Sequence, residues 1–194
     1  MKWYHNEYQE DVFNYHSADH FINIFDERQV PLRGHAVFWS VYQFVQQWVK
    51  DKAESGDLES LETDIFDRVT DLITRYAGRI PDWDVFNEVI HGDFFKNYFG
   101  ENIWDRVIDK ILEIDPNVGI VFNDYQLLSS DWHTCFLDHI KNSKHKAQGI
   151  NEQIGNYIQI IFYNFRILLL LDDKLYIPLE RKCVREDPSV GGNG

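Results

Sequence analysis

The stretch WDVFNEVIHG, residues 83–92, places an amide and a carboxylate at the end of an apolar, aromatic run. A carboxylate among apolar side chains is costly unless it is paired or its altered pKa is useful. A general acid needs such a carboxyl group, with a pKa raised by apolar surroundings or by a second carboxylate. Glu88, preceded by Asn87, is therefore a candidate general acid. The alternative is a Glu88 that is solvated or salt-bridged where a strand meets a loop.

A second carboxylate would decide what chemistry Glu88 could do. Glycoside hydrolysis with retention of configuration needs two carboxyl groups about 5–5.5 Å apart. Asp84 lies on the same predicted strand, roughly 13 Å away at ~3.3 Å per residue, which is too far. Asp124 ends the next predicted strand, and neighbouring strands lie about 4.8 Å apart. A structural hydrogen-bonding role suits Asp124 equally well, so the residues alone leave the second carboxylate open.

His35 has three possible roles: metal ligand, donor to a sugar hydroxyl, or hydrogen-bonded core residue. The metal role is the weakest, because Glu88, His91 and Asp93 form no HExxH or similar spacing. A serine nucleophile lacks support as well, since no GxSxG occurs. We therefore predict no metal site and no cofactor.

Composition and charge narrow the class of partner. The chain has 194 residues, which suits one domain, and a formal net charge of −13. Phosphate backbones and acidic membrane surfaces attract basic proteins, so neither nucleic acid nor a membrane is an expected partner. The 6 Trp, 10 Tyr and 14 Phe form either a large aromatic core or the lining of a cleft for flat-faced ligands such as sugars.

The compartment is not encoded in the chain. Its two cysteines, Cys135 and Cys183, form neither a disulfide framework nor a CxxC motif. No signal-peptide pattern opens the sequence, so we expect either an intracellular protein or a true start upstream of Met1.

The elements that must position these residues alternate between strands and helices. Apolar runs predict strands at 30–39, 82–89 and 118–125, with a strand end at 1–4. Amphipathic periodicity predicts helices at 17–29, 60–78, 102–117 and 130–144. Such alternation is typical of α/β proteins with a parallel sheet, either doubly wound or closed into a (β/α)8 barrel. Each strand ends in polar or aromatic residues and no GxGxxG or Walker loop follows one, which favours the barrel.

The last part of the chain loses this rhythm. Residues 157–171 show neither a period of 2 nor one of 3.6, and their apolar part falls short of the ~20 residues that a membrane span needs. Residues 171–194 are expected to form a disordered end.

Five motifs, taken in order, carry a resemblance to a known family: MKWY (1–4), RGHAVFW (33–39), ITRYAGRI (73–80), DWDVFNEV (82–89) and DPNVGIVFNDY (115–125). Together they resemble glycoside hydrolase family 10, the endo-β-1,4-xylanases, and are similar to its animal members. The resemblance covers residues 1–150 and implies a partial (β/α)8 TIM barrel, about strands 2 to 5 with their helices. It implies a partial family barrel at 1–155 and a non-family, poorly ordered tail at 156–194.

The resemblance also implies roles for residues at matching positions. Glu88 would be the catalytic acid/base, which protonates the leaving glycosidic oxygen and later activates water. The substrate-binding residues would be Lys2, His35, Trp39, Asn87 and Tyr125. Within this set, the amide beside Glu88 would bind the 2-hydroxyl of the sugar at the cleavage point. Lys2 and His35 would donate to hydroxyls of the same sugar. Trp39 would form its aromatic wall, and Tyr125 would be a lesser contact.

The implied function is a retaining, endo-acting hydrolase of β-1,4-linked xylan or a related plant polysaccharide. Its partner would be the polysaccharide or an oligosaccharide, with no obligate protein partner, and its location would be extracellular.

Departures from the family pattern modify this expectation. No TELD-like segment, which carries the family's nucleophile, follows residue 155, and neither Glu180 nor Glu186 follows an apolar strand. The chain supplies about four of the eight β/α units of a barrel. We therefore expect a partial chain without its nucleophile, inactive alone. The alternative is a non-catalytic carbohydrate-binding or inert remnant, and a doubly wound phosphate-binding protein is disfavoured because no Gly-rich loop occurs.

Overall fold

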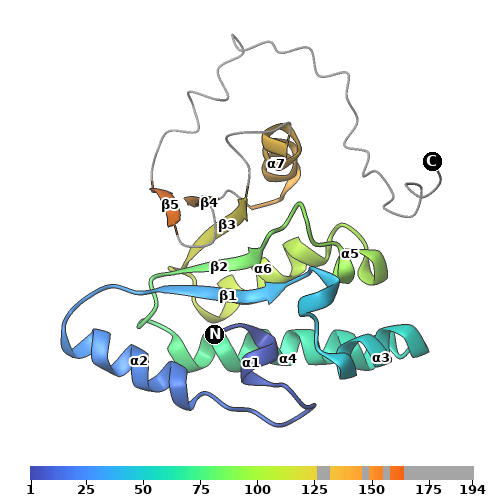
Figure 1. Ribbon diagram of the computed structural model, residues 1–194, viewed down its shortest axis with the longest axis horizontal. Helices are drawn as coiled ribbons and strands as arrows, with labels where there is room; N and C mark the ends of the chain where they lie inside the picture. Colours follow the sequence, from blue (N-terminus) through green and yellow to red (C-terminus); the bar gives the residue numbers. More distant parts are fainter. Residues whose placement is uncertain (126–131, 146–148, 155–157, 164–194) are drawn as a thin grey trace, which may run out of the picture. The chain divides into compact units, whose positions relative to one another are not determined.

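The computed structural model describes residues 1–125, 132–145, 149–154 and 158–163 (Figure 1). They contain a five-stranded sheet in the order β1-β2-β3-β4-β5. Its strands are β1 (Arg33–Trp39), β2 (Asp82–Asn87), β3 (Gly119–Tyr125), β4 (Gly149–Ile154) and β5 (Ile158–Tyr163). Strands β1 to β4 are parallel, which confirms the predicted parallel sheet, and β5 is antiparallel to β4.

The spatial order of the parallel strands follows their order in the chain. A doubly wound sheet reverses its strand order at a switch point, whereas a barrel adds each new strand beside the last one. The order β1-β2-β3-β4 therefore favours the wall of a barrel. Helices α2, α3 and α4 lie along the same side of strands β1 and β2, as the outer layer of such a wall requires (Figure 1).

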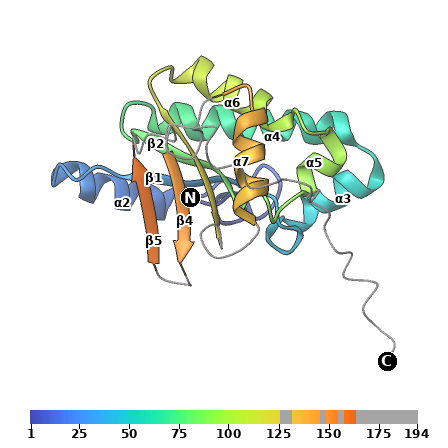
Figure 2. The same cartoon turned by 90° about the horizontal axis from the view of Figure 1, so that it is seen from above.

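Strand β5 departs from the parallel pattern and from the sequence expectation for its segment. No strand period is visible at 157–171, yet residues 158–163 pair with β4 from Ile154↔Ile158 to Gly149↔Tyr163. The two strands lie side by side in Figure 2. Only three residues separate them in the sequence, and so short a connection imposes antiparallel pairing. The predicted boundary between a barrel at 1–155 and a tail at 156–194 stays a prediction, and residues 164–194 lie outside the described residues.

The predicted long helices are confirmed as α2 (His16–Glu27), α4 (Leu58–Tyr76), α6 (Ile103–Ile114) and α7 (Trp132–Asn142). The described residues also contain α3 (Gln47–Ser55), α5 (Phe94–Phe99) and the 3-10 turn η1 (Tyr42–Phe44), which were not predicted. These are short, and a short segment gives little periodic signal.

Helix α4 shows why the longer predictions succeed. Its apolar stripe is buried along its whole length, with Leu61, Ile65, Val69, Leu72, Ile73 and Tyr76 each at most 1 % exposed. The same face buries Arg68, whose guanidinium donates to the Tyr15 hydroxyl at 2.8 Å and to the Met1 carbonyl at 2.7 Å. These bonds tie the buried guanidinium to the start of the chain through its two terminal nitrogens, while its Nε has no hydrogen-bond partner.

The predicted strand end at residues 1–4 is wrong. Helix α1 (Trp3–Asn6) forms there, preceded by an extended Lys2. The Trp3 indole donates to the Glu7 carboxylate at 2.6 Å, a contact between residues four apart that one helical turn brings together. Trp3 is buried, so the contact is shielded from water.

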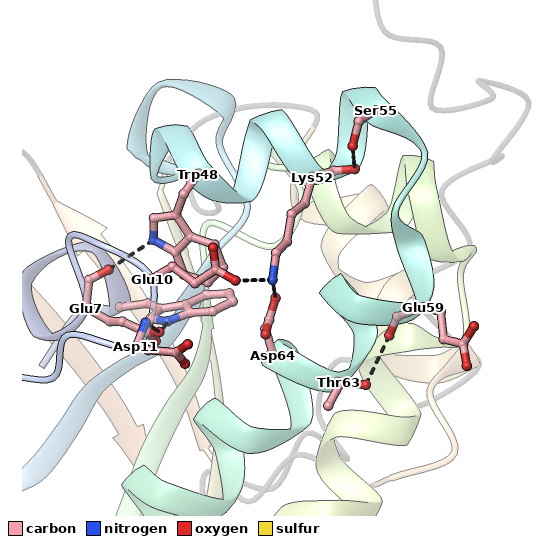
Figure 3. A network of polar contacts seen from close by, with 10 residues as sticks. Glu7, Glu10, Asp11, Trp48, Lys52, Ser55, Glu59, Thr63 and Asp64 are labelled. Atoms are coloured by element: carbon pink, nitrogen blue, oxygen red, sulfur yellow. Dashed lines mark hydrogen bonds and ion pairs between the residues drawn. The ribbon is translucent and has the colours of Figure 1, made fainter.

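A polar network holds this N-terminal segment against helices α3 and α4 (Figure 3). The Trp48 indole donates to the Glu7 carbonyl at 3.3 Å. The Lys52 ammonium bridges Glu10 at 2.5 Å and Asp64 at 2.6 Å. The network holds Glu7 and Glu10, which follow helix α1, against the two helices.

Strand β2 is buried along almost its whole length. All its residues after Asp82 are buried, as expected for a parallel strand covered on both faces. A Cβ atom on Gly34 would lie 2.1 Å from the Trp83 ring, so the glycine of β1 makes room for that indole. No helix in the described ranges is long and apolar enough to cross a membrane.

Candidate active site

Glu88 follows the last residue of β2 and adopts an unusual backbone conformation. Its φ is 57°, in the left-handed region that residues other than glycine rarely adopt. Its amide donates to the Asn123 carbonyl at 2.8 Å, and its carbonyl accepts from Gly92 N at 2.8 Å. Strained backbone of this kind gathers at functional sites, where the surroundings hold it in place.

The Glu88 carboxyl group is partly buried and is influenced by Trp39, Asp124, His91 and Lys2. The Trp39 indole of β1 donates to Glu88 Oε2 at 3.0 Å. Burial raises the pKa of Glu88, and the like charge of Asp124 adds to the rise. The Trp39 hydrogen bond and the positive charges of His91 and Lys2 act in the opposite direction. A raised pKa is what a carboxyl group needs in order to act as a general acid.

Trp39 is enclosed on both faces of its ring. The Lys2 ammonium lies 3.6 Å from the ring centroid, and Phe44 stacks on the indole at 3.5 Å with an interplanar angle of 16°. Two groups this close to one ring must occupy opposite faces. Trp39 therefore presents its edge to any ligand, and that edge already donates to Glu88. Burial lowers the pKa of Lys2, while the nearby Glu88 carboxylate opposes the shift.

His35 is oriented by a buried carboxylate. Its Nδ1 lies 2.8 Å from Asp84 Oδ2, and Asp84 is completely buried. The same oxygen accepts from the Asn123 amide at 3.2 Å and lies 3.5 Å from the Arg33 guanidinium. Asp84 thus acts on His35 and on the end of β3, and it is not available to Glu88.

Asp124 is completely buried and its carboxylate has three donors. Ile90 N donates to Oδ2 at 2.7 Å, Tyr125 N donates to Oδ1 at 2.8 Å, and His91 Nδ1 lies 2.5 Å from Oδ1. A carboxylate with this many donors from the protein is an anchor for the backbone around it. Of the two roles that the sequence leaves open for Asp124, the geometry favours the structural one.

The two remaining predicted contacts lie at neighbouring strand ends. Asn87 ends β2 and is 1 % exposed, so only a small part of its amide could meet a ligand. Tyr125 ends β3, and its ring stacks on His91 with 3.8 Å between centroids. Burial raises the pKa of Tyr125.

The structure brings Lys2, Trp39 and Glu88 into direct contact. The other predicted residues lie on neighbouring strands: His35 on β1, Asn87 on β2 and Tyr125 on β3. Sequence reasoning missed Phe44 as a stacking partner and considered His91 only as a weak metal ligand. The sequence places both residues close to predicted site residues. Phe44 lies in the segment after β1, and His91 lies in the turn after Glu88. Within the described ranges, no three His, Cys, Asp or Glu side chains are grouped so that they could hold a metal ion.

Replacing Glu88 with Gln is expected to stabilise the folded chain near neutral pH. Because the folded pKa of Glu88 is raised, the folded state keeps its proton where the unfolded chain has lost it. Ionising Glu88 therefore costs stability as the pH rises from the unfolded value of about 4.3 through the folded pKa. Gln removes this cost and still accepts from Trp39.

Thermal unfolding of both proteins across the pH range measures this effect. The melting temperature of Glu88→Gln should exceed that of the wild type at about pH 7 and equal it at about pH 4. Glu27→Gln, at an exposed position on α2, is the control for the Glu-to-Gln change itself. A Glu88→Gln variant that is less stable than the wild type at neutral pH contradicts the prediction.

The chain is similar to known proteins over most of its length. A model of glycosyl hydrolase family 10 matches residues 1–159 of the chain. The chain is 32 % identical over 127 residues to endo-1,4-beta-xylanase 1 of Arabidopsis thaliana, and the match covers 66 % of this chain. It covers 13 % of the Arabidopsis protein, so the chain spans a small part of that relative's length.

Solved structures share the fold. A GH10 endoxylanase retrieved from a sugarcane soil metagenome superposes with a TM-score of 0.68 at 25 % identity, over 79 % of this chain and 47 % of that one. A mutant of Xylanase10C from Cellvibrio japonicus in complex with xylopentaose gives a TM-score of 0.67 at 20 % identity, over 79 % and 33 %. These likenesses confirm the predicted partial barrel.

Proposed function

The chain belongs to glycosyl hydrolase family 10, and from this premise we propose that it carries the acid/base half of a retaining, endo-acting hydrolase of β-1,4-xylan or a related plant polysaccharide. The observation that supports this most is the environment of Glu88. Its carboxyl group is partly buried, has a raised pKa and accepts from Trp39 at the end of a parallel strand. In a barrel, reacting groups stand at the carboxyl ends of the strands.

Glu88 would act twice in the reaction. It first protonates the glycosidic oxygen that leaves, which a carboxyl group with a raised pKa does well near neutral pH. As a carboxylate it then takes a proton from the water that releases the bound sugar. The Trp39 indole holds the carboxyl group through both steps, because it donates to Glu88 Oε2.

The sugar beside Glu88 would be bound by polar groups that the fold already orients. Lys2 is held over Trp39, and His35 is held by Asp84. Asn87 and Tyr125 complete the set from the ends of β2 and β3. Since Lys2 and Phe44 cover the two faces of Trp39, we assign its sugar contact to the ring edge. A polysaccharide substrate is further supported by the xylopentaose bound to the Cellvibrio relative.

Neither Asp84 nor Asp124 suits the role of the second carboxylate in a retaining mechanism. Asp124 is bound by three donors, and Asp84 by His35 and Asn123. Both carboxylates are also completely buried, so neither is placed to attack a sugar carbon. Glu180 and Glu186, the tail carboxylates judged unsuitable from the sequence, lie outside the described residues. We therefore propose that this chain lacks the nucleophile and does not complete the reaction alone. Extracellular location and the lack of an obligate protein partner are proposed from the family alone.

A second candidate function is carbohydrate binding without catalysis. The observation that favours it is the same engagement of Asp84 and Asp124, which leaves neither of them as an available partner for Glu88. The two candidates share a glycan-binding surface and differ in turnover.

Calorimetric titration of the chain with xylopentaose tests that shared surface. The wild type is expected to bind, and Asn87→Ala is expected to bind about tenfold more weakly, because one lost polar contact is worth about 1.4 kcal/mol. Asn23→Ala is the matched control, since Asn23 is an exposed residue of α2 that pairs with Arg79. Absence of wild-type binding would sink both candidates, and equal affinity of Asn87→Ala would sink the assignment of the site.

A further inference from the structure

We propose that His91 is a positioning residue for Glu88, and that with Asp124 it fixes both the turn that carries Glu88 and the ring of Tyr125. The link to catalysis rests on the proposed function. The positioning of Glu88 by His91 can be tested in the chain without a ligand.

The turn after β2 needs such support. Glu88 has a φ of 57°, and a residue other than glycine keeps this conformation only where its surroundings impose it. Two amides close the turn locally, because His91 N and Gly92 N donate to the Glu88 carbonyl at 3.1 and 2.8 Å. These bonds define the turn's shape, and the amides of Glu88 and Val89 tie its first residues to the Asn123 carbonyl of β3 at 2.8 and 3.4 Å, so the later residues of the turn depend on other contacts.

Asp124 supplies the orientation from the side of β3. Its buried carboxylate accepts from Ile90 N within the turn and from Tyr125 N at the strand end. The His91 imidazole, 2.5 Å from Asp124 Oδ1, is the side-chain donor to the same group. One carboxylate therefore joins the turn of Glu88 to the strand that ends in Tyr125.

Strand β1 limits the turn from the other side. A Cβ atom on Gly92 would lie 2.7 Å from the backbone of Ser40, so the turn packs directly on the residue after Trp39. Phe94 N also donates to the Ser40 carbonyl at 3.0 Å. A turn released by Asp124 would shift Glu88 relative to the Trp39 indole that binds it.

The imidazole also contacts the predicted glycan surface directly. It stacks on Tyr125 with 3.8 Å between centroids and 18° between planes. The charged groups that act on Glu88 include Lys2, Asp124 and His91, and of these Asp124 raises its pKa while the other two lower it. Loss of His91 would therefore remove one of the two groups that offset the charge of Asp124 at Glu88.

Two substitutions separate the functions of the imidazole. His91→Asn keeps a donor near the position of Nδ1 and loses the stacked ring, whereas His91→Phe keeps a ring and loses the donor. The titration of Glu88 is followed by carbon-13 NMR of the ligand-free chain, with Glu88→Gln identifying the signal. The amide signals of Ile90 and Tyr125 report the hydrogen bonds to Asp124.

His91→Phe is expected to raise the titration midpoint of Glu88, because one of the groups that offset the Asp124 charge is lost. It should also move the amide signals of Ile90 and Tyr125. His91→Asn should leave these amide signals near their wild-type positions and shift the midpoint less. A merely structural role would lower the melting temperature of both variants and leave the Glu88 midpoint unchanged.

Unchanged amide signals and an unchanged Glu88 midpoint in His91→Phe would overturn the proposal. Should that variant not fold, the wild type decides: an exchange-protected His91 Nδ1 proton close to the Tyr125 ring is expected, and its absence overturns the proposal. Titration with xylopentaose keeps the two ideas apart. A wild type that binds no glycan while His91→Phe shifts Glu88 rejects the proposed function alone, and binding with no effect on Glu88 rejects the positioning role alone.

Discussion

The purified 194-residue chain is expected to release no reducing sugar from β-1,4-xylan. A retaining hydrolase forms and then breaks a covalent bond between the sugar and a second carboxylate about 5–5.5 Å from the acid. In the part of the chain that the structure describes, the carboxylates of Asp84 and Asp124 are completely buried and bound by protein donors. Glu88 alone protonates a leaving group without stabilising the sugar cation that results. The measurement is a reducing-sugar assay, with an active family 10 xylanase as positive control.

The informative comparison is between the wild type and Glu88→Ala. Both should stay at background. Sugar release by the wild type that Glu88→Ala abolishes would contradict the prediction and would show that a second carboxylate is present. Asp124→Ala, assayed beside it, would then tell whether Asp124 or a tail residue such as Glu180 supplies that group.

Periodicity predicted the helices and strands whose residue pattern follows from the burial of apolar side chains. The stripe of α4, from Leu61 to Tyr76, is buried as its spacing of three and four residues requires. Strands β1, β2 and β3 are apolar runs because both faces of a parallel sheet are covered. Helix α1 was missed because a specific side-chain contact one helical turn along, the hydrogen bond of Trp3 to Glu7, supports a helix where a short apolar stretch indicates a strand.

The site could be predicted as a set of residues but not as a set of contacts. Glu88 stood out because a carboxylate follows an apolar run, and the family motifs added Lys2 and Trp39. The stacking of Phe44 on Trp39 and the pairing of His35 with Asp84 depend on loop geometry and on register between strands. Asp84 was considered only as a partner for Glu88 and set aside on distance, whereas its function in the structure is to hold His35.

Asp84→Ala is expected to be the most destabilising single substitution among the site's supporting residues. Asp84 is completely buried and faces the Arg33 guanidinium and the His35 imidazole, with side chains 11 % and 28 % exposed. Removing one partner of a buried ion pair leaves an uncompensated charge, which costs about 3–5 kcal/mol. A domain of this size has about 5–15 kcal/mol of stability in total, so the variant should unfold at a much lower denaturant concentration. Equilibrium unfolding in urea, followed by tryptophan fluorescence, measures the loss.

Asp26→Ala is the matched control for this loss, since Asp26 also pairs with an arginine, Arg79 at 2.6 Å, but on the surface. An exposed pair contributes less than about 1 kcal/mol, so this variant should behave as the wild type. Asp84→Asn should fall between the two, because it keeps the shape and one acceptor oxygen while losing the charge. Equal costs for Asp84→Ala and Asp26→Ala would show that Arg33 and His35 find other partners. In that case His35 would not depend on Asp84 for its orientation toward a glycan.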